Sequence, residues 1–174
     1  MKKITFIVVI FLWVTNSIFA QSDWVRSGSE KSKISFEMPE NPTIQERELN
    51  GIKVEIFGYK DAATVFGVVA SDFSDIGLDF TYSDPSEYYE QMKEASLVTG
   101  DAILVSEQSV AYQKMLGKEI VYTQLVGKHE YTYYKRFFFR KKFIYQAAIG
   151  GPTRMKQFLV DKKNIFFNTL EFID

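Results

Sequence analysis

The residues best able to bind a ligand form a stretch of alternating aromatic and basic side chains between residues 128 and 145. Aromatic rings can stack on bases or sugars while neighbouring cations hold phosphate or sulfate groups. The period-2 spacing favours a simpler interpretation, a strand with one buried face and a basic hairpin turn at 140–142. The candidate ligand or partner surface consists of Tyr134, Lys135, Arg136, Arg140, Lys141 and Lys142.

A second group of polar residues is acidic and could offer the hard oxygen ligands that calcium prefers. Its members are Asp72, Asp75, Asp79, Asp84 and Glu87. Their spacing is not that of an EF-hand loop, and Asp84 suits the N-terminal cap of a helix. We interpret the group as a solvent-exposed loop and predict no metal site.

Catalytic signatures are sparse. The single histidine, His129, could act as a general base, but its position between Lys128 and Glu130 predicts an exposed residue in a turn. The absence of cysteine excludes disulfides, iron–sulfur clusters and a thiol nucleophile. Neither a G-x-S-x-G nucleophile elbow nor a phosphate-binding P-loop occurs. We predict no catalytic residue and no cofactor.

The first residues resemble a secretory signal peptide. Lys2 and Lys3 precede an apolar run over 4–14, and Ala20 offers a small residue before a cleavage site. The run is shorter than the roughly 20 residues that span a bilayer. The pattern predicts a signal peptide over 1–20, typical of bacterial export, and a periplasmic or extracellular product with no membrane span after cleavage.

Composition describes a globular chain of 174 residues, 46% hydrophobic, 25% charged and 16% aromatic. The net charge is −1, and loss of Lys2 and Lys3 would make the mature chain more acidic. Non-specific nucleic-acid binding depends on many cationic contacts to phosphate, so we expect no nucleic-acid partner. Since no linker-like composition divides residues 21–174, we predict a single domain there.

Hydrophobic periodicity predicts strands, a helix, strands and a second helix. Alternation indicates strands at 34–38, 43–49, 52–57, 64–70, 103–112, 119–126, 131–139 and 143–149. A helix is expected over about 85–97, with Asp84 and Glu87 forming a capping box, and another over 155–170 with a possible break at 161–164. The predicted class is α+β, an antiparallel sheet of about six to seven strands with flanking helices.

Several segments, in this order, resemble the Mog1/PsbP-like family. They are Trp24, Ile34-Ser35-Phe36-Glu37-Met38-Pro39, Leu116-Gly117-Lys118-Glu119, Phe143-Ile144-Tyr145-Gln146 and the closing Phe166 to Phe172. The chain is most similar to the small exported bacterial members of unassigned function. The resemblance implies an antiparallel sheet with flanking helices and a binding or accessory role. One branch of the family engages a small GTPase and the photosynthetic branch supports an oxygen-evolving complex; no functional residue of either branch matches a position here.

These observations predict an exported, non-enzymatic accessory protein that binds a protein or envelope component. Two alternatives stay open. The aromatic content would suit a small-molecule or lipid carrier, which needs an apolar cavity of at least about 300 Å³. A carboxylate-dependent exported hydrolase would need two convergent acids, whose spacing in sequence is not fixed.

Overall fold

The computed structural model describes residues 24–98 and 101–174, so the predicted signal peptide over 1–20 lies outside the described residues. The strands are β1 (Val25–Ser29), β2 (Ile34–Met38), β3 (Thr43–Leu49), β4 (Ile52–Lys60), β5 (Val65–Asp72), β6 (Ile103–Tyr112), β7 (Met115–Val126), β8 (His129–Arg140), β9 (Phe143–Pro152) and β10 (Glu171–Phe172). The helices are η1 (Ser74–Ile76), α1 (Ser86–Leu97), η2 (Thr153–Met155) and α2 (Lys156–Asn168). Within the described ranges, none of these helices has the length and apolar character to cross a membrane.

Seven strands form one antiparallel sheet in the order β3-β4-β5-β9-β8-β7-β6. Tight turns connect the strands within each hairpin, whereas η1 and α1 lie between β5 and β6. Asn50 and Gly51 take the positive φ angles of 52° and 78° that their sequence predicts. The two runs of hairpins, β3–β5 and β6–β9, join where β5 pairs with β9. This arrangement confirms the predicted α+β class and the predicted meander over 103–149.

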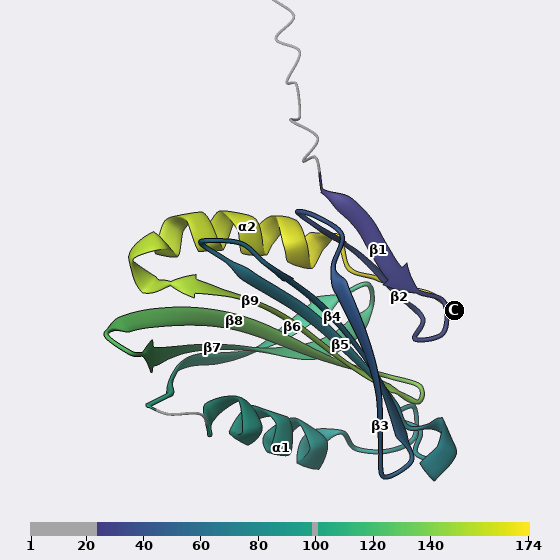
Figure 1. The fold of residues 1–174 in the computed structure, drawn as a ribbon. Helices are drawn as coiled ribbons and strands as arrows, with labels where there is room; N and C mark the ends of the chain where they lie inside the picture. Colours follow the sequence, from purple (N-terminus) through teal and green to yellow (C-terminus); the bar gives the residue numbers. More distant parts are fainter. Residues whose placement is uncertain (1–23, 99–100) are drawn as a thin grey trace, which may run out of the picture.

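The strand at 34–38 does not extend this sheet, although the sequence suggests one continuous sheet. It pairs with β1 and β10 in a separate three-stranded sheet. Its buried residues Ile34, Phe36 and Met38 alternate along one face, and the Phe36 ring lies 5.2 Å from that of Phe57 in β4. The small sheet therefore covers the large sheet, and Figure 1 shows it on the same side as α2, opposite α1.

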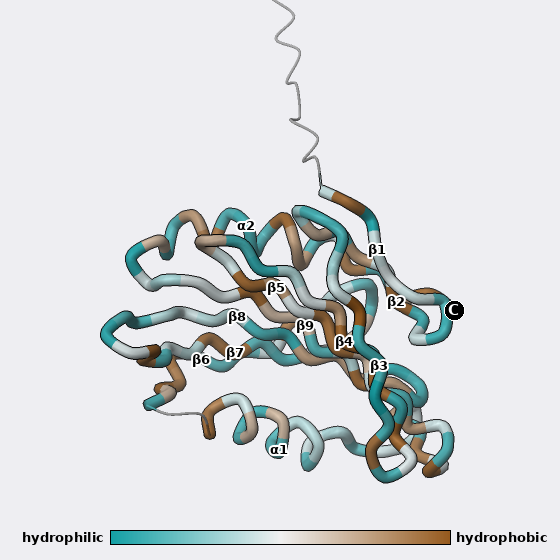
Figure 2. The backbone as a smooth tube through the Cα atoms, viewed as in Figure 1, coloured by the Kyte–Doolittle hydropathy of each residue, from teal (hydrophilic) through white to brown (hydrophobic). Residues whose placement is uncertain are grey.

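The main core lies between the large sheet, the small sheet and α2. Ring centroids of Phe66 and Phe166 are 5.3 Å apart, and Trp24 packs edge-on to Phe66. Hydrophobic colour accordingly gathers in the central strands in Figure 2, while the β7–β8 turn is hydrophilic. A smaller cluster under α1 packs Tyr89 against Phe137. Each face of the sheet thus has its own apolar layer.

Two details of the predicted helices are wrong. The helix α2 runs without the break expected at 161–164, because the polar residues lie beside its buried face and Lys162 and Lys163 cover the rings of Trp24 and Tyr134. At α1, Asp84 accepts a hydrogen bond from the Ser86 N–H at 3.0 Å, but Glu87 bonds to Gln91 and no capping box forms.

Gly150 in β9 permits a close approach that a side chain would block. A Cβ atom there would lie 2.2 Å from the ring of Tyr133, whose strand pairs with β9. We expect Gly150→Ala to lower the free energy of unfolding by about 1–3 kcal/mol, the usual cost of overpacking. Urea denaturation would measure the change. Gly58→Ala is the matched control, since a Cβ at Gly58 would meet no atom within 4 Å; equal losses for both variants would contradict the packing argument.

Candidate functional site

The six residues of the predicted surface lie on three different parts of the molecule. Tyr134 and Arg136 face α2, where the Tyr134 side chain is buried. The Arg136 Nε donates to Glu119 Oε2 at 2.6 Å, and its guanidinium lies 4.5 Å from the centroid of the Phe167 ring. Both residues therefore belong to the packing between β8 and α2.

Lys135 points to the opposite face of β8, under α1. Its Nζ donates to Ser96 Oγ at 3.0 Å and lies 5.3 Å from the centroid of the Phe137 ring. Burial of the ammonium group lowers the pKa of Lys135 to about 8. Alternation along the strand thus separates Lys135 from Arg136.

The other three predicted residues do come together. Arg140, Lys141 and Lys142 form the turn between β8 and β9 and line a cavity of about 230 Å³, which we call the Arg140 pocket. The remaining residues of its lining are Lys33, Asp79, Phe143, Ile173 and Asp174. Sequence reasoning missed Lys33, because it reaches the pocket only through the pairing of the small sheet.

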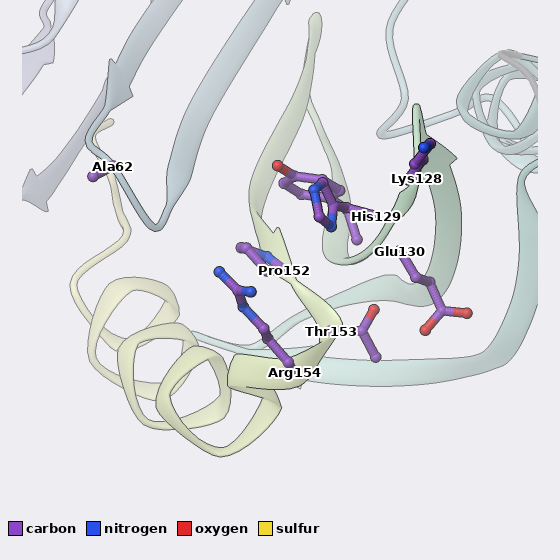
Figure 3. A pocket seen from close by; sticks show the side chains of 8 residues that line it. Ala62, Lys128, His129, Glu130, Pro152, Thr153 and Arg154 are labelled. Atoms are coloured by element: carbon purple, nitrogen blue, oxygen red, sulfur yellow. The ribbon is translucent and has the colours of Figure 1, made fainter.

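A larger cavity of about 530 Å³ lies at the opposite end of β8, and we call it the His129 cleft (Figure 3). Its lining residues are Ala62, Lys128, His129, Glu130, Tyr131, Pro152, Thr153 and Arg154. His129 is exposed, as its flanking residues predict, but it begins β8 instead of lying within the turn.

The walls of the His129 cleft are held in place by short contacts. Asp61 accepts hydrogen bonds from the N–H groups of Ala63 and Thr64 at 2.7 Å and 2.6 Å, which shape the β4–β5 turn. Burial raises the pKa of Asp61, but these hydrogen bonds outweigh it and the net shift is downward. This turn packs so closely on β9 that a Cβ at Gly151 would lie 2.4 Å from the Ala63 carbonyl oxygen.

The His129 cleft is suited to bind anionic groups. Lys128 and Arg154 contribute positive charge, and Glu130 is the one acid in its lining. Figure 3 shows the Glu130 carboxylate directed away from Arg154 and Pro152. The Thr153 hydroxyl shares a hydrogen bond of 2.9 Å with Thr132, so it is already engaged.

The acidic residues of the 72–87 loop make local hydrogen bonds. Asp72 and Asp84 accept from the N–H groups of Ser74 and Ser86, and Asp79 accepts from that of Thr81. Over residues 24–98 and 101–174, no group of three or more histidines and acids is placed to hold a metal ion. These contacts account for Asp72, Asp79 and Asp84 as turn and cap residues. Asp75 instead pairs with Lys53 at 2.7 Å, and Glu87 accepts a hydrogen bond from Gln91.

Comparison with known proteins gives similarity in structure alone. No protein-family model and no curated protein sequence matches the chain. The solution structure of cyanobacterial PsbP (CyanoP) from Synechocystis sp. PCC 6803 is similar with a TM-score of 0.55 and 11% identity, over 87% of this chain and 93% of that one.

Two further structures are similar at TM-scores below 0.5. The protein of unknown function PA94 from Pseudomonas aeruginosa gives 0.48 with 12% identity, over 84% of this chain and 94% of that one. A protein of Bacteroides thetaiotaomicron VPI-5482 gives 0.49 with 14% identity, over 86% of this chain and 48% of that one. The likeness to CyanoP, together with the seven-stranded antiparallel sheet and its flanking helices, shows that the chain has the Mog1/PsbP-like fold.

Proposed function

We propose that the chain is an exported, non-enzymatic accessory protein that binds a protein or envelope component through the His129 cleft. The observation that carries the proposal is the cleft itself, a cavity of about 530 Å³ whose lining holds the two cations Lys128 and Arg154 and one acid, Glu130. Cations that line a concave surface attract acidic groups of a partner and orient it. The fold shared with CyanoP adds support, because the resemblance to the Mog1/PsbP-like family implies a binding or accessory role.

Export is part of this proposal and rests on the sequence of residues 1–20. Lys2, Lys3, the apolar run and Ala20 support translocation followed by cleavage, leaving residues 21–174 as one domain. N-terminal sequencing of protein from the periplasmic or extracellular fraction would test it. A mature chain that begins near Gln21 is expected, whereas retention of Met1 in the cytosolic fraction would contradict export.

The two alternatives fit the structure less well. The apolar cavity between α1, β6 and β7, lined in part by Tyr89, Leu116 and Phe139, has a volume of about 200 Å³. Ligand pockets usually exceed about 300 Å³, which disfavours a carrier. A carboxylate-dependent hydrolase needs two carboxylates roughly 5–10 Å apart on either side of the scissile bond. Glu130 is the one acid among the eight lining residues of the His129 cleft.

The binding proposal is tested by removing the two cations of the cleft. The tagged wild type is incubated with envelope extract, and captured proteins are quantified by mass spectrometry. We expect Lys128→Gln/Arg154→Gln to reduce capture of the specific partner at least about tenfold, the effect of losing roughly 1.4 kcal/mol of binding free energy. The matched control is Arg47→Gln/Lys114→Gln, which removes the same charge from two exposed positions elsewhere. Equal capture by both double variants would overturn the role of the cleft.

A further inference from the structure

We propose that the Arg140 pocket is a second binding site, specific for a carboxylate of a partner protein. In the free protein Asp174 pairs with the cations at the rim of the pocket, and an acidic side chain of the partner displaces it; we call Asp174 the latch. This site goes beyond the proposed function, because it uses none of the residues of the His129 cleft. The two sites lie at opposite ends of β8, roughly 35 Å apart at about 3.3 Å per residue.

Positive charge dominates the pocket. Its lining contains the four cations Lys33, Arg140, Lys141 and Lys142, and only two acids, Asp79 and Asp174. The Asp79 carboxylate accepts a hydrogen bond of 2.8 Å from the Thr81 N–H. Hydrogen bonds from Thr81 and the nearby charges of Lys142 and Lys141 hold the pKa of Asp79 below its usual value. An additional carboxylate would therefore enter a site of net positive charge.

The pocket is built from three segments that backbone hydrogen bonds tie together. The N–H groups of Phe73 and Phe80 donate to the carbonyl oxygens of Lys142 and Lys141 at 2.8 Å and 2.6 Å. On the other side, the Ile173 N–H donates to the Lys33 carbonyl oxygen at 2.8 Å. Since the cations stand on a hydrogen-bonded backbone, ligand binding needs to order their side chains but little of the main chain.

Asp174 indicates which ligand chemistry the pocket accepts. Its carboxylate binds the Arg140 guanidinium and lies 3.4 Å from Lys141 Nζ. Arg140 also donates to the Ile173 carbonyl oxygen at 2.6 Å, so the guanidinium is directed toward Ile173 and Asp174. A carboxylate from the same chain thus shows the geometry in which a carboxylate from another protein would bind.

The latch can be displaced because it is exposed. The Asp174 side chain is 89% exposed, whereas the Arg140 side chain is 18% exposed. Ion pairs with an exposed member contribute little to stability. A competing carboxylate can therefore displace Asp174 from Arg140 at a small cost in free energy. The neighbouring Phe143 and Ile173 add apolar walls, which favours an acidic residue flanked by apolar residues over a free inorganic anion.

The test measures binding of a short peptide to the purified full chain by isothermal titration calorimetry. The probe is acetyl-Asp-Ile-Asp-amide, and its control is acetyl-Asn-Ile-Asn-amide. We expect the acidic peptide to bind, the neutral peptide not to bind, and Asp174→Asn to increase affinity at least about threefold because the latch is removed. Arg140→Gln should reduce affinity for the acidic peptide at least about tenfold.

Lys142→Gln provides a variant that keeps the fold, because Lys142 is exposed. It should weaken binding of the acidic peptide without any effect on folding, which circular dichroism would verify.

Several results would overturn the proposal. One is equal affinity of the wild type and Arg140→Gln for the acidic peptide, and another is binding of the neutral peptide. Binding to phosphatidylglycerol vesicles but not to the peptide would assign the pocket to a lipid surface instead. Arg154→Gln should leave peptide binding unchanged, because Arg154 lies in the His129 cleft. The peptide titration therefore tests the Arg140 pocket alone, and capture of a partner from envelope extract tests the His129 cleft alone.

Discussion

Replacing Arg136 with methionine is expected to lower the free energy of unfolding by about 3–5 kcal/mol, because it leaves a buried carboxylate without its partner. The Glu119 side chain is 3% exposed, and Arg136 Nε lies 2.6 Å from its Oε2. Gln108 and the more distant Lys163, at 3.0 Å and 3.9 Å, satisfy the other carboxylate oxygen only in part. Guanidinium chloride denaturation would measure the loss.

The double variant Glu119→Gln/Arg136→Met separates charge from packing. It removes the buried charge together with its partner, and a glutamine at this position can still bond to Gln108. We expect the double variant to recover most of the lost stability, since replacing both members of a buried pair is often nearly neutral. A control at an exposed position, Arg47→Met, should change stability by less than about 0.5 kcal/mol. A double variant as unstable as Arg136→Met would show that the arginine acts by packing on Phe167 instead.

The second large effect has the opposite sign. We expect Lys135→Met to raise the free energy of unfolding at pH 7 by about 2 kcal/mol. The lowering of the pKa of Lys135 from 10.5 to about 8 means that the folded chain destabilises the charged ammonium group by roughly 3 kcal/mol relative to the unfolded chain. Loss of the hydrogen bond to Ser96 offsets about 1 kcal/mol of this gain. Ser96 stays satisfied in the variant, because its hydroxyl also donates to the Met92 carbonyl oxygen at 2.7 Å.

The pH dependence provides an independent check on Lys135. Between pH 8 and pH 10.5 the unfolded chain binds a proton that the folded chain has released, so wild-type stability rises with pH over this window. Above pH 10 the buried tyrosines oppose this trend, since burial raises the pKa of Tyr122 to about 12 and ionisation then favours the unfolded chain. Denaturation curves at pH 7, 8, 9 and 10 should show rising stability for the wild type and a flatter profile for Lys135→Met. Identical profiles would contradict a buried, destabilised ammonium group.

Arg136 and Lys135 show where the structure places two residues of the predicted surface, each in a packing contact beneath a helix. The alternation of aromatic and basic residues was visible in the sequence, and it correctly indicated a strand ending in a basic turn at 140–142. The alternation did not predict which helix or side chain each cation would contact on its face of the sheet. Arg136 binds Glu119, its cross-strand partner in the β7–β8 hairpin, and packs on Phe167. Lys135 binds Ser96. Ser96 and Phe167 lie on the two helices, which local patterning does not place relative to β8.

Local physics is sufficient for most of the elements. Asn50-Gly51 dictates a turn because both residues tolerate positive φ, and Asp84 marks a helix start because its side chain can cap an N–H group. The continuity of α2 was harder to predict, because a run of polar residues at 161–164 looks like a break unless the buried face on either side of it is known.

The sequence by itself thus determined the order of β2 to β9 and of the two α-helices, the α+β class, the absence of thiol chemistry and the basic turn, since each depends on neighbouring residues or on composition. The short strands β1 and β10 were not predicted. Only the tertiary structure decided that β2 leaves the large sheet, that Lys33 and Asp174 meet at the Arg140 pocket, and that Ala62 and Arg154 close the His129 cleft. The physical reason is that pairing between strands far apart in the chain is selected by the packing of whole faces. A local sequence pattern does not specify which residue from a distant part of the chain completes the lining of a cavity.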